Sequence, residues 1–229
     1  MDPEYRLRYE GILSFFQDVV ATYLETENLA AFQIRPDGRM WIISEITARV
    51  TDRLPVWMEK VFVTISPTEV SSLKMYFDYS LANADGKVFA DGSSCWSIMD
   101  IESGRPVRLP DFISFVGENS SRHTRNLLPA VTDAAFEEQH RVTAYDLDFN
   151  YHLNNIRYVT MALASVPVDV VRNGAMSNLV IRFMRQCFAD EILTCRYSSA
   201  DFTDEVGCSI VNQDGQEVCR VGLNRHSFV

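Results

Sequence analysis

The stretch that decides the architecture of this chain is Asp146-Leu-Asp148-Phe-Asn150-Tyr-His152-Leu-Asn154-Asn155. Asp148, Asn150 and His152 alternate along it, so an extended backbone would place an acid, an amide and an imidazole on one face. An apolar run of helical period follows, ends before Pro167, and is preceded by two Asn residues that are good N-caps. Because free N–H groups at a helix start favour developing negative charge, the stretch combines the groups that hydrolysis of an activated acyl group requires.

The same order of elements occurs twice along the chain. Apolar residues at helical spacing predict one helix over 11–27 and another over 154–166, and each is followed by four strand-like runs. An Asp-Gly pair at 85–86 and another at 214–215 each indicate a hairpin between the third and fourth runs. The expected strands are 40–50, 60–66, 72–82 and 87–99, then 178–188, 192–198, 206–212 and 216–224. This order predicts two copies of one α+β unit.

The segment between the two units has no strong period over residues 110–139. We expect it to connect the halves, with a short helix at 134–140 and then a strand at 141–147 that leads into the motif. The predicted division is therefore an N-terminal domain over 1–115, a connection over 116–139 and a C-terminal domain over 140–229.

Composition excludes several classes of function. The 229 residues carry a formal net charge of −10, and the absence of a basic stripe argues against a nucleic-acid partner. No apolar run has the length of a membrane span, and the polar, acidic start does not resemble a signal peptide. The five cysteines form no CxxC pair, which favours reduced thiols in a cytoplasm over a disulfide framework or a zinc site. We expect no metal and no cofactor.

The motif, followed by an aromatic helix and Ser165-Val-Pro167, resembles that of the acyl-acyl carrier protein thioesterases, the plant plastid enzymes that end fatty-acid synthesis and their bacterial relatives. Weaker matches cover most of the chain. They are Tyr9-Glu10, Trp41-Ile-Ile, Arg53-Leu-Pro-Val-Trp57, Cys95-Trp-Ser-Ile-Met-Asp100 and Arg105-Pro-Val-Arg-Leu-Pro110.

The resemblance implies two tandem hotdog domains, each a long helix packed on a curved antiparallel sheet. It implies hydrolysis of fatty acyl-acyl carrier protein to the free fatty acid, with an acyl tunnel in the N-terminal domain for which Phe15, Phe16, Trp41, Ile43 and Ile46 are possible wall residues. It also implies acyl carrier protein as the partner and catalytic roles for Asp148, Asn150 and His152. The chain is expected to be a monomer or a homodimer, since the tandem already supplies two hotdog units.

One position departs from the family pattern. Where the family has a catalytic Glu in Tyr-Arg-Arg-Glu-Cys, this chain has Gln186, between Arg185 and Cys187. An amide can orient water or bind a carbonyl oxygen, but it cannot accept a proton as a carboxylate does. Three interpretations follow: Asp148 is the base, His152 is the base, or the protein is a slow or inactive hydrolase. We keep Gln186 as a fourth candidate site residue.

Two further alternatives concern the reaction itself. Cys187 beside an activating His152 would be a nucleophile, but a small buried residue in a strand is the more frequent fate of a free Cys. The alternative functions are an acyl-CoA thioesterase of the hotdog superfamily and a non-catalytic acyl-binding protein, the latter because Gln186 replaces the acid.

Overall fold

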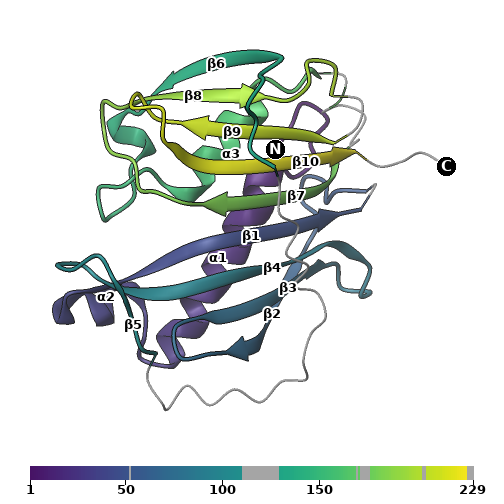
Figure 1. Ribbon diagram of the computed structural model, residues 1–229. Coiled ribbons are helices and arrows are strands. Elements are labelled where there is room, and N and C mark those ends of the chain that lie inside the picture. Colours follow the sequence, from purple (N-terminus) through teal and green to yellow (C-terminus); the bar gives the residue numbers. More distant parts are fainter. Residues whose placement is uncertain (52, 110–128, 169, 171–175, 203–204, 226–229) are drawn as a thin grey trace.

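The computed structural model describes residues 1–51, 53–109, 129–168, 170, 176–202 and 205–225, and Figure 1 shows the arrangement of their elements. The elements of the first half are helices α1 (Tyr9–Thr26) and α2 (Ala31–Ile34), the 3-10 turn η1 (Arg35–Asp37), and strands β1 (Arg39–Val50), β2 (Phe62–Val70), β3 (Met75–Ala82), β4 (Val88–Asp100) and β5 (Pro106–Val107). The second half contains β6 (Phe136–Arg141), the 3-10 turn η2 (Ala144–Asp146), α3 (Asn155–Ala164), β7 (Met176–Phe183), β8 (Ile192–Tyr197), β9 (Val206–Val211) and β10 (Glu217–Arg225).

The strands form one antiparallel sheet in the order β2-β3-β4-β1-β7-β10-β9-β8-β6, with β5 paired to β4. Read outward from the centre, the first half runs β1-β4-β3-β2 and the second half runs β7-β10-β9-β8. The two halves therefore have the same topology and meet where β1 pairs with β7. This internal symmetry is the tandem hotdog arrangement expected from the sequence.

The long helix α1 lies behind the sheet in the view of Figure 1. Its buried residues recur at helical spacing: Tyr9, Ile12, Leu13, Phe16, Val20 and Leu24. Asn28 adopts a left-handed φ of 60°, and the Leu29 N–H then bonds the Leu24 carbonyl at 2.8 Å. Such a closure satisfies carbonyl groups that would otherwise be left free at a helix end.

The second helix starts as predicted, at an Asn cap. The Asn154 side-chain oxygen accepts the Ile156 N–H at 2.9 Å, and α3 then continues to Ala164, shortly before Pro167. Both Asp-Gly hairpins are also present, since Gly86 and Gly215 have φ values of 80° and 75° between paired strands. These features follow from local sequence, and all were expected.

The connection before the motif differs from the prediction. The expected helix at 134–140 and strand at 141–147 are wrong, because the chain forms β6 over Phe136–Arg141 and then the turn η2. Strand β6 pairs with β8, so this part of the expected 116–139 connection extends the C-terminal sheet; residues 110–128 lie outside the described part of the chain. Tertiary pairing has overridden the helix propensity of Ala-Ala-Phe-Glu-Glu. The strand expected over 178–188 also ends earlier, at Phe183.

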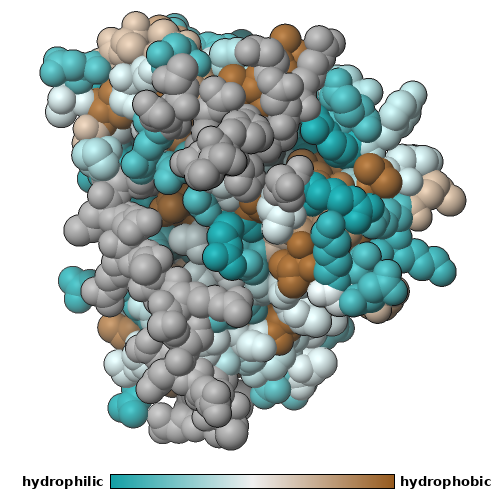
Figure 2. Space-filling model, turned by 90° about the vertical axis from the view of Figure 1, so that its right-hand side faces the viewer, coloured by the Kyte–Doolittle hydropathy of each residue, from teal (hydrophilic) through white to brown (hydrophobic). Residues whose placement is uncertain are grey.

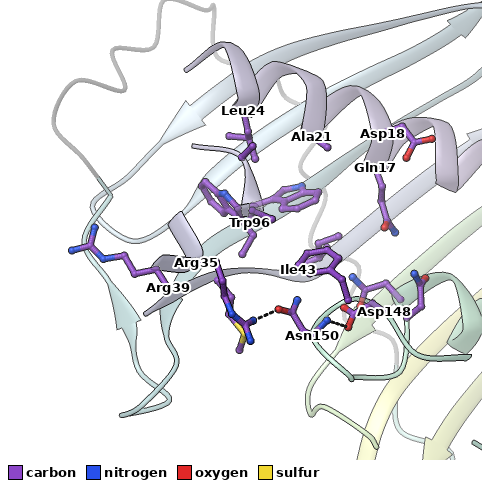
Figure 3. A pocket seen from close by; sticks show the side chains of 17 residues that line it. Gln17, Asp18, Ala21, Leu24, Arg35, Arg39, Ile43, Trp96, Asp148 and Asn150 are labelled. Atoms are coloured by element: carbon purple, nitrogen blue, oxygen red, sulfur yellow. Dashed lines mark hydrogen bonds between the residues drawn. The ribbon is translucent and has the colours of Figure 1, made fainter. Parts of the chain in front are cut away.

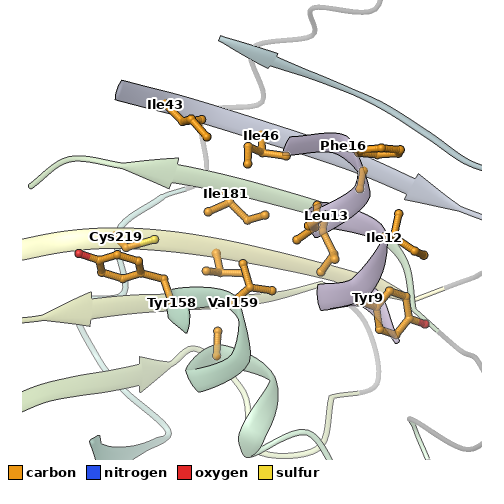
Figure 4. Packing of buried hydrophobic residues seen from close by; sticks show 14 of the residues in the cluster. Tyr9, Ile12, Leu13, Phe16, Ile43, Ile46, Tyr158, Val159, Ile181 and Cys219 are labelled. Atoms are coloured by element: carbon orange, nitrogen blue, oxygen red, sulfur yellow. The ribbon is translucent and has the colours of Figure 1, made fainter. Parts of the chain in front are cut away.

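A continuous hydrophobic core joins the two halves. Ile43 and Ile46 of β1, Ile181 of β7, Leu13 of α1 and Val159 of α3 are all buried members of one cluster (Figure 4). Helix α1 also contacts α3 directly. The core therefore fixes the position of each half relative to the other.

The outer surface is largely hydrophilic on the face shown in Figure 2, where hydrophobic side chains occupy several separate spots. Within the described residues, no helix combines the length and the apolar character needed to cross a bilayer.

Gly92 tests the close contact between β1 and β4. A Cβ at this position would lie 2.1 Å from the Thr47 carbonyl oxygen, which belongs to the backbone and cannot move aside cheaply. We expect Gly92→Ala to lower the free energy of unfolding by about 1–3 kcal/mol, as overpacking does. Gly207→Ala is the matched control within β9, because its nearest neighbour would be the Val131 side chain at 3.4 Å. Equal urea midpoints for the two variants would contradict the expectation.

Candidate active site

The decisive motif folds as a tight turn, not as the extended strand that its alternating residues suggested. Leu147 and Leu153 form a β-bridge, and between them the Asp148 N–H bonds the His152 carbonyl at 2.7 Å. Tyr151 adopts a left-handed φ of 62° inside this loop. The polar groups are therefore brought near one another by a turn and not by the two-residue period of a strand.

The Asp148 carboxylate holds this turn closed. Its Oδ1 accepts the N–H groups of Asn150 at 2.8 Å and His152 at 3.1 Å. This is the local role for which Asp is favoured in turns. Within the described residues, the other carboxylate oxygen of Asp148 accepts no hydrogen bond, and Asp148 also lines a cavity. One carboxylate oxygen of Asp148 therefore stabilises the turn.

A cavity of about 410 Å³ opens between the two halves (Figure 3). It is lined by Gln17, Asp18, Ala21, Leu24, Ala30, Ala31, Arg35, Arg39, Met40, Trp41, Ile43, Trp96, Asp148, Phe149, Asn150, Asn154 and Asn155. The first half supplies the apolar lining and the second half supplies the motif and the start of α3. Of the expected tunnel residues, Trp41 and Ile43 line the cavity, whereas Phe16 and Ile46 are buried in the core and Phe15 is exposed.

The cavity opens where β1 departs from β7. The two strands pair from Glu45 to Arg49, and a register shift between Ile43 and Glu45 marks a bulge in the pairing with β4. Residues before the bulge, including Met40 and Trp41, pair with β4 and face the cavity. Bulges often occur beside active sites because they redirect a strand and its side chains.

Asn150 is held by a residue from the other half. An Arg35 guanidinium nitrogen donates a hydrogen bond to the Asn150 side-chain oxygen, which leaves the amide N–H groups of Asn150 as donors (Figure 3). Arg35 and Arg39 both line the cavity, where the carboxylates of Asp18 and Asp148 balance their two positive charges. Sequence reasoning missed both arginines, because only the fold brings η1 and the start of β1 to a motif more than a hundred residues away.

The other two predicted site residues lie beside this cavity rather than in its lining. The His152 ring packs edge-on against Phe188 with ring centroids 5.2 Å apart, and the Gln186 side chain is exposed. Of the four expected site residues, Asp148 and Asn150 line this cavity, and His152 and Gln186 do not. The segment itself does run beside the motif, because the Leu153 N–H bonds the Cys187 carbonyl at 2.8 Å.

Cys187 has the environment of a core residue. Its side chain is fully buried, and burial raises the pKa of the thiol to about 12, with the nearby Glu191 carboxyl adding to the rise. Tyr158, which donates a hydrogen bond to the Arg185 carbonyl at 3.3 Å, contacts the same thiol. A thiol so protonated is a poor nucleophile. Glu191 is an acid near the motif that sequence reasoning did not single out.

Comparison with protein families assigns the class of this molecule. Residues 1–115 match the model of the acyl-ACP thioesterase N-terminal domain, and residues 130–224 match that of the acyl-ACP thioesterase C-terminal domain. The chain therefore belongs to the acyl-ACP thioesterase family.

Individual relatives are distant in sequence. A chloroplastic palmitoyl-acyl carrier protein thioesterase of Arabidopsis thaliana is 23% identical over 243 residues, covering 92% of this chain and 57% of its own length. The chain spans about half the length of several such curated relatives. An acyl-ACP thioesterase structure from Bacteroides thetaiotaomicron has a TM-score of 0.87 at 16% identity, covering 99% of this chain and 93% of that one. A 12:0-ACP thioesterase structure from Umbellularia californica has a TM-score of 0.84 at 17% identity, covering 99% of this chain and 92% of that one. These structures show the shared fold.

The state of Cys187 can be tested by alkylation. In the native protein we expect iodoacetamide to leave Cys187 unmodified at mildly alkaline pH, because the thiol is buried and its pKa is raised to about 12. After unfolding in urea all five cysteines should react, which provides the control. Mass spectrometry of peptides locates the modification. Rapid native labelling of Cys187 would support the nucleophile hypothesis instead.

Proposed function

We propose that this chain hydrolyses the thioester of fatty acyl-acyl carrier protein. The observation that carries the proposal is the cavity between the halves, where an apolar wall from the first half meets the Asp148–Asn150 turn of the second half. An apolar cavity with a few convergent polar groups is the usual form of a small-molecule site. Membership of the acyl-ACP thioesterase family supports the same activity.

In the proposed reaction, water attacks the thioester carbonyl carbon. The acyl chain lies along Leu24, Trp41 and Trp96, where its burial is favourable. The amide N–H groups of Asn150, oriented by Arg35, and the start of α3 at Asn154 stabilise the negative charge on the carbonyl oxygen. Asp148 takes the proton of the attacking water.

We assign the base role to Asp148 and not to Gln186. Asp148 lines the cavity and has a carboxylate oxygen that the turn does not use, whereas Gln186 is exposed and lacks a carboxylate. His152 holds a neighbouring position against Phe188, from which an imidazole can relay the proton to the departing thiolate after a small movement. Gln186 is proposed to orient solvent at the edge of the site.

The proposed partner is acyl carrier protein, carrying its acyl chain on a phosphopantetheine arm. Arg35 and Arg39 supply charged hydrogen-bond donors for the phosphate of such an arm, beside the carboxylates of Asp18 and Asp148 in the same lining. The cytoplasm is the proposed location, with the five free, buried thiols as support.

A second candidate function is acyl binding without hydrolysis, and the exposed Gln186 in place of an acid is the observation that favours it. Hydrolysis assays with acyl-carrier and acyl-CoA substrates of several chain lengths separate the possibilities. Release of free fatty acid from acyl carrier protein supports the main proposal. Faster hydrolysis of acyl-CoA would indicate an acyl-CoA thioesterase. Tight binding of the acyl substrate without any turnover would indicate the binding function.

Substitution of Asp148 separates its catalytic role from its structural role. Asp148→Asn keeps an oxygen that can accept the Asn150 and His152 N–H groups but removes the base, so kcat should fall roughly 10²–10⁴-fold with little change in melting temperature. Asp148→Ala should lose both activity and stability, since the turn loses its acceptor. Full activity in a stable Asp148→Asn variant would mean that Asp148 is only a turn residue.

Gln186→Glu provides the companion experiment. Because Gln186 is exposed and outside the cavity lining, the new carboxylate should change kcat by less than about threefold, or lower it by repulsion with Asp148. His152→Ala should nearly abolish turnover under the same conditions. A large gain in kcat for Gln186→Glu would show that the family acid still acts from this position and that the natural chain is a weakened enzyme.

A further inference from the structure

Gln17 presents a buried hydrogen-bond donor to the cavity. Its side-chain Nε2 is buried and has no hydrogen-bond partner within the described residues, and Gln17 lines the cavity. His140 Nε2 is another such atom within the described residues, but His140 does not line this cavity. Leaving a buried donor unsatisfied costs about 1–3 kcal/mol, so such groups are rare without a reason.

The position of Gln17 indicates what the amide meets. Figure 3 shows Gln17 extending from α1 toward the end of the cavity that holds Asp148, whereas Leu24 and Trp96 lie at the other end. The Gln17 amide therefore lies near the boundary between the apolar wall and the hydrolytic turn. An acyl chain seated against the tryptophans would place its carbonyl group at this boundary.

We propose that Gln17 Nε2 donates a hydrogen bond to the carbonyl oxygen of the bound thioester, which makes Gln17 a further catalytic residue. This inference rests on the proposed function. The oxygen of water bonds to the carbonyl carbon, and a proton of that water passes to Asp148. At the same time, the π electrons of the C=O bond move to the carbonyl oxygen. The C=O bond then re-forms, the C–S bond breaks, and the departing sulfur receives the proton. Gln17 stabilises the oxygen while it carries negative charge.

In this arrangement each half of the protein supplies one hydrogen-bond donor to the carbonyl oxygen of the thioester. Gln17 reaches the carbonyl from the first half, while Asn150 reaches it from the second half under the control of Arg35. Removing one preorganised donor from such a site costs about 10²-fold or more in kcat. A residue that only shapes the apolar wall would affect KM and chain-length preference instead.

The kinetic test uses Gln17→Leu, which keeps the approximate size of the side chain and removes the donor. We expect kcat for acyl-acyl carrier protein hydrolysis to fall about 10²-fold, with a much smaller change in KM. Glu25→Leu is the control, because Glu25 is exposed on the same helix and does not line the cavity. Gln17→Met serves the same purpose if the leucine variant folds poorly. Unchanged kcat in a folded variant overturns the proposal.

A binding test separates this proposal from the proposed function. Two non-hydrolysable palmitoyl-pantetheine analogues are compared: a ketone, in which CH₂ replaces sulfur and the carbonyl stays, and a thioether, in which CH₂ replaces the carbonyl. Wild type should bind the ketone about three- to tenfold more tightly than the thioether, the value of one hydrogen bond. Gln17→Leu should lose that difference, and Glu25→Leu should keep it.

The outcomes are distinct. A carbonyl preference that depends on Gln17, in a protein without turnover, supports the contact and refutes the proposed hydrolysis. Turnover in wild type with a carbonyl preference that survives Gln17→Leu supports the hydrolysis and refutes the contact. Equal binding of both analogues to wild type, or binding of neither, also overturns the role of Gln17.

Discussion

The pairing of β1 with β7 is the constraint on which the site depends. It joins the two halves, of five strands each, into one sheet over the short register from Glu45 to Arg49. The pairing stops where a bulge lies between Ile43 and Glu45. Beyond that point β1 follows β4, and the gap that opens toward the second half is the cavity. Because the apolar wall stands on one side of this junction and the Asp148 turn on the other, the site exists only while the two halves are held in register.

The sequence predicts the parts of this structure that depend on local signals. Helical spacing around Phe16, the Asn154 cap and the two Asp-Gly turns each act within a few residues, and all are present. Strand β6 could not be read in this way, because its residues favour helix and its strand state comes from pairing with β8, more than fifty positions later. The cavity could not be predicted from local sequence either, because Gln17 and Arg35 come close to the motif only where the two halves meet.

The motif itself shows why a correct pattern led to an incorrect geometry. Asp, Asn and His at alternate positions suit an extended strand, but they also suit a turn, in which a short acid accepts successive N–H groups. The turn prevails because Asp148 satisfies two backbone donors at once and Leu153 closes the loop against Cys187. The same carboxylate thus builds the loop and faces the cavity, so structural and catalytic explanations of Asp148 are complementary.

The two halves share a topology but not a chemistry. The cavity lies where the start of α3 meets the later turns of α1, and the symmetric arrangement also exists, where the start of α1 meets the end of α3. There, a smaller cavity of about 250 Å³ is lined by Arg8 and Glu10, which form an ion pair at 3.5 Å, and its lining contains no amide or imidazole side chain. The α1 start also lacks a side-chain cap, unlike the Asn154 start of α3. Within the described residues, this second cavity therefore pairs Arg8 with Glu10 and has no counterpart of the Asp148–Asn150 turn, so the two symmetric positions of the duplicated fold differ in chemistry.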